Sequence, residues 1–260
     1  MSLIDQENTG AAPILRLAGV GRRFGGLHAV SDVSFDVAHG ERRVILGPNG
    51  AGKTTLFNLV AGDLPPTSGS VELFGRDVTP IGPPGRAKLG LARTYQKSRL
   101  FLGLSVADNL FLAVLGVRSG HLRPFHAKAR DDAMRERAIW AAGQVGMAGS
   151  MDRIVGSLSH GEQRQLEVGM AMATDPKLML LDEPCSGLSR GERGKLTEML
   201  LGLDRSLTLI LIEHDMDVAL RVGERVTMMH DGRVIVEGTP SEIRANETVH
   251  DLYLGKGHRE

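Results

Sequence analysis

The chain has little cysteine, no excess of charge and no long apolar run. Cys185 is the one cysteine in 260 residues, so an internal disulfide is impossible and the composition fits a reducing cytosol. Basic and acidic residues number 31 each, which argues against a basic nucleic-acid-binding surface. The cluster from Arg118 to Arg137 is interleaved with acids and predicts a solvated helix face. We therefore expect no nucleic-acid partner.

Segments that direct a chain into a membrane are also missing. Met1 to Pro13 is polar and acidic, without the basic and apolar regions of a signal peptide. Leu100 to Val117 approaches the length of a membrane span but contains Asp108, Asn109 and two glycines. Ser105 and Asp108 have the spacing of a capping box that opens an apolar helix. We expect a soluble protein, so that any membrane-spanning work falls to other chains.

The most specific motif that is present is a phosphate loop. Residues 47–54 read Gly-Pro-Asn-Gly-Ala-Gly-Lys-Thr and fit G-x-x-x-x-G-K-[ST] at every fixed position. An apolar run precedes the motif and a helical pattern follows it, so loop amides and a helix N-terminus can face an anion. Lys53 can reach the β- and γ-phosphates, and Thr54 can ligate Mg²⁺. The motif predicts ATP or GTP binding; the alternative is an ordinary glycine-rich turn.

The remaining pattern predicts an α/β fold with an inserted helical lobe. Strands are expected at 14–20, 30–37, 42–46, 70–74, 91–95, 178–181, 208–212, 225–229 and 233–236. Helices are expected at 127–145, 161–174, 190–205 and 215–222, with two short ones between 240 and 254. A strand, phosphate loop and helix, followed later by strand–helix–strand, predict a parallel core.

Polar side chains follow the predicted buried strands. Asp182 closes one of these strands, where it can reach Mg²⁺, and Glu183 can polarise the water that attacks the γ-phosphate. His214 follows the next strand and can bond the γ-phosphate or the water. Gln96 lies where the helical lobe begins and can ligate Mg²⁺ or position water. Two solvated acids and a structural histidine are the alternatives when each residue is taken alone.

A second helix start carries serine and glycine. Ser159 is a plausible N-cap with Glu162 three residues later. An ordinary helix start explains this string locally, but such an N-terminus is also an anion site. One chain would not bring it to its own phosphate loop.

These elements, in this order, resemble the ATP-binding cassette of ABC transporters over roughly residues 14–254. Residues 47–54 match its Walker A loop, Gln96 its Q-loop, Ser159–Gln163 its signature, Leu178–Glu183 its Walker B strand, Ser186–Ser189 its D-loop and His214 its H-switch. The signature departs from the common form at His160 and Glu162, which puts the role of His160 in doubt. The D-loop ends in Ser189 where aspartate is usual, which puts contacts across the dimer in doubt.

The resemblance implies a P-loop NTPase core with a mostly parallel sheet (about 14–96 and 175–238). It also implies an N-terminal antiparallel β subdomain, an inserted helical subdomain (about 97–174) and a tail (about 239–260). ATP and Mg²⁺ are the implied cofactors, with Thr54, Gln96 and Asp182 at the metal and Lys53, Glu183 and His214 in catalysis. The implied nucleotide contacts are Phe24, which would stack on adenine, with Gly47, Pro48, Asn49, Gly50, Ala51, Gly52, Lys53, Thr54, Thr55, Gln96, Ser159, Gly161 and Glu162.

Within that family the chain looks like the ATPases of branched-chain amino acid uptake systems. The segment Arg23–Val30, the long insertion after Gln96 and the tail from Glu237 to Gly255 carry this likeness. It implies an importer subunit at the cytoplasmic face of the cell membrane. The implied partners are a second cassette (a copy or a paralogue), two permease subunits that meet residues 97–104 and the helical lobe, and, indirectly, a solute-binding protein.

Three other functions remain open from the sequence. A lipopolysaccharide-export cassette shares short signature variants, but the long insertion and the tail argue against it. A soluble ABC ATPase acting on DNA or ribosomes usually carries two cassettes or coiled-coil arms. A nucleotide-binding regulator without turnover would not need Lys53, Asp182, Glu183 and His214 together. Cargo other than branched-chain amino acids, such as urea, amides or aromatic acids, also remains open.

Overall fold

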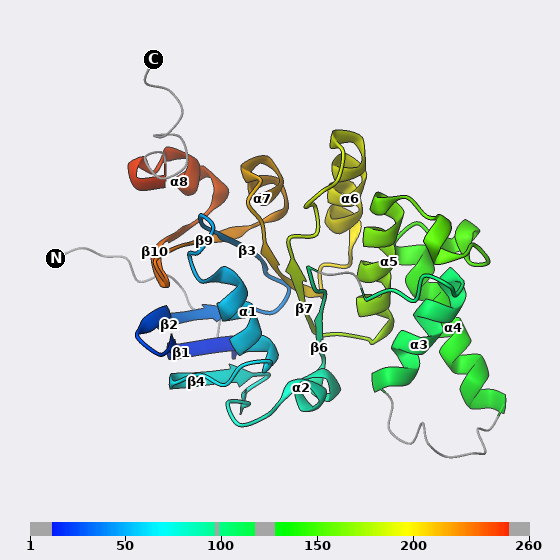
Figure 1. Ribbon diagram of the computed structural model, residues 1–260, viewed down its shortest axis with the longest axis horizontal. Coiled ribbons are helices and arrows are strands. Elements are labelled where there is room, and N and C mark those ends of the chain that lie inside the picture. The colour runs from blue at the N-terminus through cyan, green and yellow to red at the C-terminus, as the bar shows by residue number, and fades with distance from the viewer. Residues whose placement is uncertain (1–11, 97–98, 118–127, 250–260) are drawn as a thin grey trace.

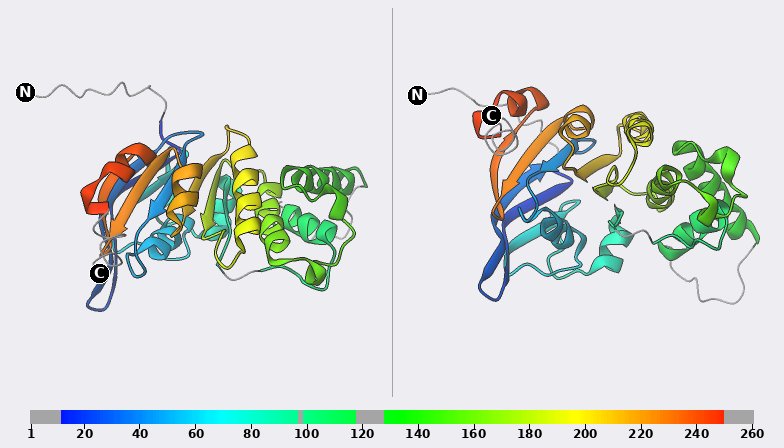
Figure 2. Two further views of the ribbon diagram at one scale, coloured as in Figure 1. Left: turned by 90° about the horizontal axis from the view of Figure 1, so that it is seen from above. Right: turned by 45° about the horizontal axis from the view of Figure 1, so that its top comes forward.

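The computed structural model describes residues 12–96, 99–117 and 128–249. A β-rich lobe and a helical lobe lie next to each other along the long axis (Figures 1 and 2). The strands are β1 (Leu15–Phe24), β2 (Leu27–Val37), β3 (Arg42–Leu46), β4 (Ser68–Leu73), β5 (Arg76–Asp77), β6 (Leu91–Arg93), β7 (Leu178–Asp182), β8 (Thr208–Ile212), β9 (Arg225–His230) and β10 (Arg233–Gly238). The α-helices are α1 (Lys53–Ala61), α2 (Pro83–Leu89), α3 (Val106–Val117), α4 (Lys128–Gln144), α5 (His160–Ala173), α6 (Arg190–Gly202), α7 (Met216–Val222) and α8 (Pro240–Ala245).

The larger sheet confirms the predicted mostly parallel core. Its strand order is β10-β9-β3-β8-β7-β6, and β10 alone pairs antiparallel within it. Every residue of β7 and β8 is buried, because helices or a second sheet cover both faces of these apolar runs. Their carboxyl ends, Asp182 and Ile212, therefore lie at the edge that the phosphate loop also occupies.

The smaller sheet is antiparallel, with the order β2-β1-β4-β5. The hairpin of β1 and β2 extends beyond the predicted ranges 14–20 and 30–37, as far as the turn at Gly25 and Gly26. Register shifts along β1 interrupt its alternation of inward and outward side chains. The alternation in the sequence therefore did not indicate the last part of the hairpin. β5 was not predicted because it has only two residues.

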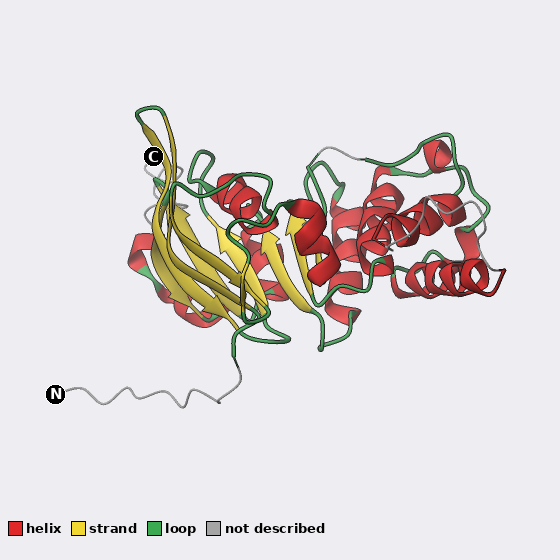
Figure 3. Ribbon diagram, turned by 90° about the horizontal axis from the view of Figure 1, so that it is seen from below, coloured by secondary structure: helices red, strands yellow, loops and turns green. Residues whose placement is uncertain are grey.

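The helical lobe consists mainly of α3, α4 and α5, on the side away from the strands (Figure 3). α4 and α5 confirm the predicted helices to within about one residue at the described ends. The capping box that opens α3 is confirmed: the Asp108 N–H donates to Ser105 Oγ at 3.1 Å, and the Ser105 N–H donates to Asp108 Oδ2 at 3.3 Å. Residues 118–127, which hold the first part of the charged cluster, lie outside the described residues, whereas Asp132, Arg135 and Glu136 on α4 are exposed.

One helix was missed by the sequence prediction and another was predicted too long. α2 was missed because it is short and begins with two prolines, which helices accept only in their first turn. α6 ends at Gly202 and not at 205, because Leu203 is extended (ψ 149°) and the Ser206 N–H bonds Asp204 Oδ1 in a turn.

Side chains of β3 alternate between two apolar clusters. Val44 and Leu46 belong to the cluster shared with α5, α6 and α7, whereas Ile45 faces the cluster that holds α1 between the two sheets. This alternation fixes the phosphate loop, because β3 enters it and α1 leaves it.

Within the described parts of the chain, every helix falls short of the length and hydropathy that a membrane span requires. The tail residues Tyr253–Gly255 lie outside the described residues, and the division of the chain at about 97, 175 and 239 stays a prediction.

Candidate nucleotide-binding site

The phosphate loop joins the end of β3 to the start of α1, as predicted. Gly52 precedes α1 with φ 96°, and a Cβ on it would lie 2.4 Å from the Ala29 oxygen. A Cβ on Gly47 would lie 2.3 Å from the Met229 oxygen. Both glycines are therefore required by close backbone approach.

Lys53 is bonded to the loop that it is expected to serve. Its Nζ donates to the carbonyl oxygens of Gly47 at 2.6 Å and Pro48 at 3.0 Å. Burial lowers the pKa of this ammonium, while the negative charges of Glu183 and Asp182 act in the opposite direction. Lys53 is thus held at the phosphate loop, and the negative charges of Glu183 and Asp182 act on its ammonium group.

A pocket of about 580 Å³ brings most of the predicted residues together. The predicted site residues that line this pocket are Phe24, Asn49, Gly50, Ala51, Gly52, Lys53, Thr54, Thr55, Gln96 and Glu183. The sequence did not indicate five others that line it, namely Leu27, His28, Ala29, Asp231 and Gly232. Phe24 is 44% exposed at its rim, and the Arg22 guanidinium lies 4.7 Å from the centre of its ring.

Asp182 ends β7 and is buried beside the pocket. Its Oδ2 accepts from Nη2 of Arg93 at 3.1 Å, and its Oδ1 is buried without a hydrogen-bond partner in the described protein. Burial raises the pKa of this carboxyl group, and Arg93 opposes the rise. An unpartnered buried oxygen next to a phosphate loop has the chemistry of a site for a hard cation.

Glu183 lies in the pocket in an unusual backbone conformation. Its φ is 49°, in the left-handed region that side chains other than glycine seldom adopt. A bond from its N–H to the Ile212 oxygen (3.0 Å) holds it against the end of β8. Its Oε2 lies 4.0 Å from Nδ1 of His214, whose side chain is 54% exposed. The structure thus places His214 next to Glu183 but does not include it in the pocket lining.

Gln96 is exposed in the pocket and begins the passage to the helical lobe. Its backbone oxygen accepts from Nη2 of Arg164 on α5 at 3.2 Å. This bond joins α5 directly to the segment that carries Gln96.

The predicted signature forms a well-capped helix start, away from the pocket. Ser159 Oγ accepts from the Glu162 N–H at 3.2 Å, and Glu162 Oε2 accepts from the Ser159 N–H at 2.7 Å, which confirms the capping box. The buried Gly161 donates its N–H to Oε1 of Glu192 on α6 at 3.1 Å. Ser159, Gly161 and Glu162 are not brought to this chain's own phosphate loop.

One buried acid behind the site was missed. Glu213 is fully buried, and its Oε1 accepts from the Cys185 N–H at 3.1 Å. Burial raises the pKa of the Glu213 carboxyl group. The bond ties the segment after Glu183 to the residue before His214. The only signal for Glu213 in the sequence was its place directly after an apolar strand. That place does not distinguish a buried acid from a solvated one.

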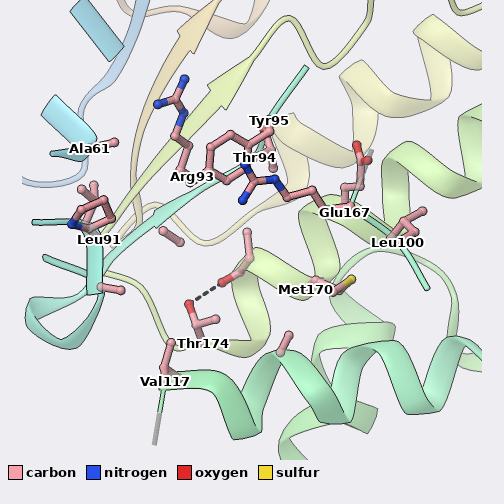
Figure 4. Close-up of a pocket in the computed structure, with 16 residues that line it drawn as sticks. Ala61, Leu91, Arg93, Thr94, Tyr95, Leu100, Val117, Glu167, Met170 and Thr174 are labelled. Atoms are coloured by element: carbon pink, nitrogen blue, oxygen red, sulfur yellow. Dashed lines mark hydrogen bonds between the residues drawn. The ribbon is translucent and has the colours of Figure 1, made fainter. Parts of the chain in front are cut away.

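A second pocket, which we call the interlobe groove, lies between β6 and the helical lobe. It has a volume of about 300 Å³. Figure 4 shows Arg93 and Tyr95 on one side and Glu167, Met170 and Thr174 on another. The exposed apolar residues Phe101, Leu102 and Leu104 lie in the segment that leads from β6 to α3.

Comparisons with known proteins bear on the family of the chain. A family model described as ABC transporter matches residues 30–186, and one described as branched-chain amino acid ATP-binding cassette transporter matches residues 233–259. The high-affinity branched-chain amino acid transport ATP-binding protein LivG of Escherichia coli (strain K12) is 37% identical over 254 residues, covering 94% of this chain and 98% of LivG. BraF of Pseudomonas aeruginosa, which bears the same description, is 35% identical over 258 residues, with coverage of 94% and 98%.

Solved structures give the same result for the fold. A nucleotide-free ATP-binding cassette from an ABC transporter has a TM-score of 0.81 at 27% identity, covering 94% of this chain and 100% of that one. The ADP conformation of an ATP-binding cassette has a TM-score of 0.82 at 28% identity, covering 95% and 100%. The predicted fold class is confirmed. With the phosphate loop in place and the family model covering more than half of its length, the chain belongs to the ABC transporter family and carries its ABC ATPase domain.

Proposed function

We propose that this ABC ATPase hydrolyses ATP to drive the uptake of branched-chain amino acids, or of a related small solute, through separate membrane subunits. The observation that carries the proposal is the pocket in which the phosphate loop, Gln96 and Glu183 surround one space. The likeness of the chain to LivG and BraF along almost their whole length supports the solute class.

The nucleotide is held by its phosphates. Residues 49–55, which include the N-terminus of α1, line the pocket, and loop amides with a helix N-terminus attract anionic oxygens. Lys53 turns from its two carbonyl partners to the β- and γ-phosphates. Phe24 offers its exposed ring to the adenine base.

Mg²⁺ fits the donors beside these phosphates. Thr54 is exposed in the pocket, Gln96 lines it, and Asp182 keeps one buried oxygen without a partner. Hydroxyl, amide and carboxylate oxygens are the donors that Mg²⁺ accepts. When bound, the ion neutralises charge that develops on the phosphate oxygens.

Glu183 acts as the base in hydrolysis. Its carboxylate accepts a proton from the water whose oxygen bonds the γ-phosphorus, while the bond from that phosphorus to the ADP oxygen breaks. His214, 4.0 Å from the Glu183 carboxylate, holds the water or a γ-phosphate oxygen.

The signature serves a second cassette. Because Ser159 and Gly161 lie away from this chain's own phosphate loop, this helix start serves the nucleotide of a partner, either a copy or a paralogue. The N–H groups of Ser159 and Gly161 would then exchange their bonds to Glu162 and Glu192 for the phosphates. Closure on ATP then brings two cassettes together.

The interlobe groove receives a cytoplasmic segment of a permease subunit. Its lining is mostly apolar, and Phe101 and Leu102 beside it are about half exposed. The chain would thus be bound at the cytoplasmic face of the membrane without a span of its own, and a solute-binding protein would act on it only through the permease.

Uptake in cells that lack the chain tests this proposal. The panel contains labelled leucine, valine, urea, short amides and aromatic acids, and the cells are rescued with wild type or Glu183→Gln. We expect branched-chain uptake to return with wild type alone. Unchanged uptake of the whole panel in the deletion would contradict an importer and favour export or a soluble ABC role.

The purified Glu183→Gln variant tests the assigned base. Removing a general base typically slows catalysis by about 10²–10⁴-fold, whereas the amide keeps the shape of the side chain. We therefore expect turnover to fall at least about a hundredfold, the lower end of that range, with ATP binding retained. Glu198→Gln, on the exposed face of α6, is the control and should keep wild-type turnover.

A further inference from the structure

Arg93 is a buried cation that connects three elements of the nucleotide site. It is the last residue of β6, and its side chain is 6% exposed. Nη1 donates to Oδ1 of Asn58 on α1 and to Oδ2 of Asp63, both at 2.7 Å, and Nη2 donates to Oδ2 of Asp182 at 3.1 Å. A single guanidinium therefore ties the helix after the phosphate loop to the end of β7.

The two carboxylate oxygens of Asp182 differ in their partners. Oδ2 is held by the guanidinium, whereas Oδ1 is buried and has no partner in the described protein. A buried carboxylate with neither oxygen bonded would be strongly disfavoured. With one oxygen paired, the group keeps its orientation while the other oxygen has no partner in the described protein.

The end of β6 also fixes the backbone of Asp182. The Asp182 N–H donates to Oγ1 of Thr94 at 3.3 Å, and the Thr94 N–H donates to the Leu180 oxygen at 2.9 Å. The residue after Arg93 thus holds the main chain of Asp182, and Arg93 holds its side chain.

The same arginine lies at the wall of the interlobe groove. Its guanidinium is 4.9 Å from the centre of the Tyr95 ring, and that of Arg99 is 3.8 Å from the same centre. Arg93, Tyr95 and Arg99 all line the groove, and Figure 4 shows the first two of them. Arg93 therefore reaches from the groove to the carboxylate that is buried beside the nucleotide pocket.

We propose that Arg93 is a positioning residue for Mg²⁺: it holds Oδ2 of Asp182 so that Oδ1 is presented to the ion bound with the nucleotide. This inference rests on the nucleotide site proposed above and not on the identity of the solute. It assigns to Arg93 a role that neither its strand position nor its distance along the chain from Asp182 indicates.

Binding of a fluorescent ATP analogue to the full chain tests the proposal without turnover. Affinity is measured by anisotropy without Mg²⁺ and along a Mg²⁺ titration, for wild type and for Arg93→Met. Loss of a residue that orients a metal ligand costs about 10–100-fold in metal affinity. We expect the Mg²⁺ midpoint to rise at least about tenfold, the lower end of that range, with the Mg²⁺-free affinity unchanged.

Arg99→Met is the matched control, because this guanidinium lies against the same Tyr95 ring while the bond to Asp182 comes from Arg93. Its Mg²⁺ midpoint should stay at the wild-type value. An unchanged midpoint in Arg93→Met, or equal losses with and without Mg²⁺, would overturn the proposal.

Arg93→Lys keeps the proposal testable if the methionine variant does not fold. The guanidinium uses Nη1 for Asn58 and Asp63 and Nη2 for Asp182, whereas lysine has a single nitrogen and lacks this planar fork, so the midpoint should still rise. A lysine variant with wild-type Mg²⁺ dependence would overturn the inference. If wild type itself fails to bind the analogue, the proposed nucleotide site fails, and that outcome is distinct from a failure of Arg93 alone.

Discussion

At the scale of single residues, backbone strain coincides with the proposed base. Glu183 adopts φ 49° although it carries a side chain, and such a conformation costs on the order of 1–3 kcal/mol. The bond from its N–H to Ile212 and the bond from Cys185 to the buried Glu213 hold the segment on either side. The strained backbone therefore keeps the Glu183 carboxylate in the pocket of the phosphate loop, at the expense of local stability.

The lone thiol in this segment should be unreactive in the folded protein. Cys185 is 3% exposed, and burial, together with the Glu213 carboxylate, raises its pKa to about 12 from an ordinary value of 9.0. Since the thiolate is the nucleophile, its lower population alone slows reaction with Ellman's reagent by about a thousandfold at about pH 8. We expect the absorbance to rise quickly only after guanidinium chloride unfolds the chain.

Because the chain has one cysteine, the control is simple. Ser206→Cys in a Cys185→Ala background places the thiol at an exposed position and should react at the rate of an unfolded thiol. Native Cys185 reacting within about tenfold of that control would contradict the burial and the raised pKa.

At the scale of elements, two capping boxes meet through one carboxylate. Glu192 belongs to the box that opens α6, where it accepts from the Ser189 N–H at 3.1 Å, and it also accepts from the Gly161 N–H of α5. These bonds lower the pKa of Glu192 to about 2, with the Ser189 side chain as the largest cause and the Gly161 amide next. The carboxylate thus joins the helical lobe to the β-rich lobe.

This contact predicts a pH dependence of stability. The folded pKa of about 2 is below the ordinary value of 4.5, so the stabilisation is fully present above pH 4.5 and is lost as the pH falls towards 2. Urea unfolding should show Glu192→Gln less stable than wild type at neutral pH, with the difference shrinking below pH 4.5. A difference that is constant with pH would contradict an ionised Glu192 at this contact.

Glu242→Gln is the matched control for the capping box alone. Glu242 occupies the same position in the Thr239 box of α8, and its pKa is lowered chiefly by the bond from the Thr239 N–H. It lacks the second helix start that Gly161 provides to Glu192. The pH-dependent difference should therefore be smaller for Glu242→Gln than for Glu192→Gln.

Elements whose sequence signals lie within one short stretch of the chain could be predicted. The buried strands β7 and β8 are apolar runs, and the phosphate loop and the boxes at Ser105 and Ser159 have fixed spacings. Each of these signals is complete within about ten residues. The hairpin ends, β5 and α2 lacked such a signal, since bulges, two-residue length and prolines hid them.

Residues whose roles come from tertiary contacts could not be predicted. Arg93 meets Asp182 across 89 positions of the chain, and Glu213 meets Cys185 across 28. An arginine at a strand end and an acid before a histidine are typical of solvated positions. Only the parallel pairing of β6 with β7 and of β7 with β8 brings these side chains together.

At the scale of the whole molecule, the two lobes meet at the interlobe groove. Gln96 is bonded to Arg164 of α5 through its backbone oxygen, and Arg93 reaches from the groove to Asp182. An occupant of the groove would therefore contact the segment that joins the lobes and the side chain that holds the carboxylate of the nucleotide site. This geometry gives a physical route by which a docked permease segment and the nucleotide can influence each other.

The exposed apolar segment beside the groove should be required for assembly but not for folding. Phe101 and Leu102 are 54% and 52% exposed, so the double change Phe101→Ser and Leu102→Ser should alter the free energy of unfolding by no more than about 0.5 kcal/mol per site. Binding buries such side chains, and each loss then costs about 1.5–3 kcal/mol. We expect the tagged variant to co-purify with far less permease and to lose uptake, while it still binds the ATP analogue.

Ile139→Ser on α4, which is 57% exposed away from the groove, is the matched control and should assemble normally. Equal loss of assembly in both variants would attribute the effect to surface hydrophobicity in general, and full assembly of the double variant would remove the groove from the permease contact.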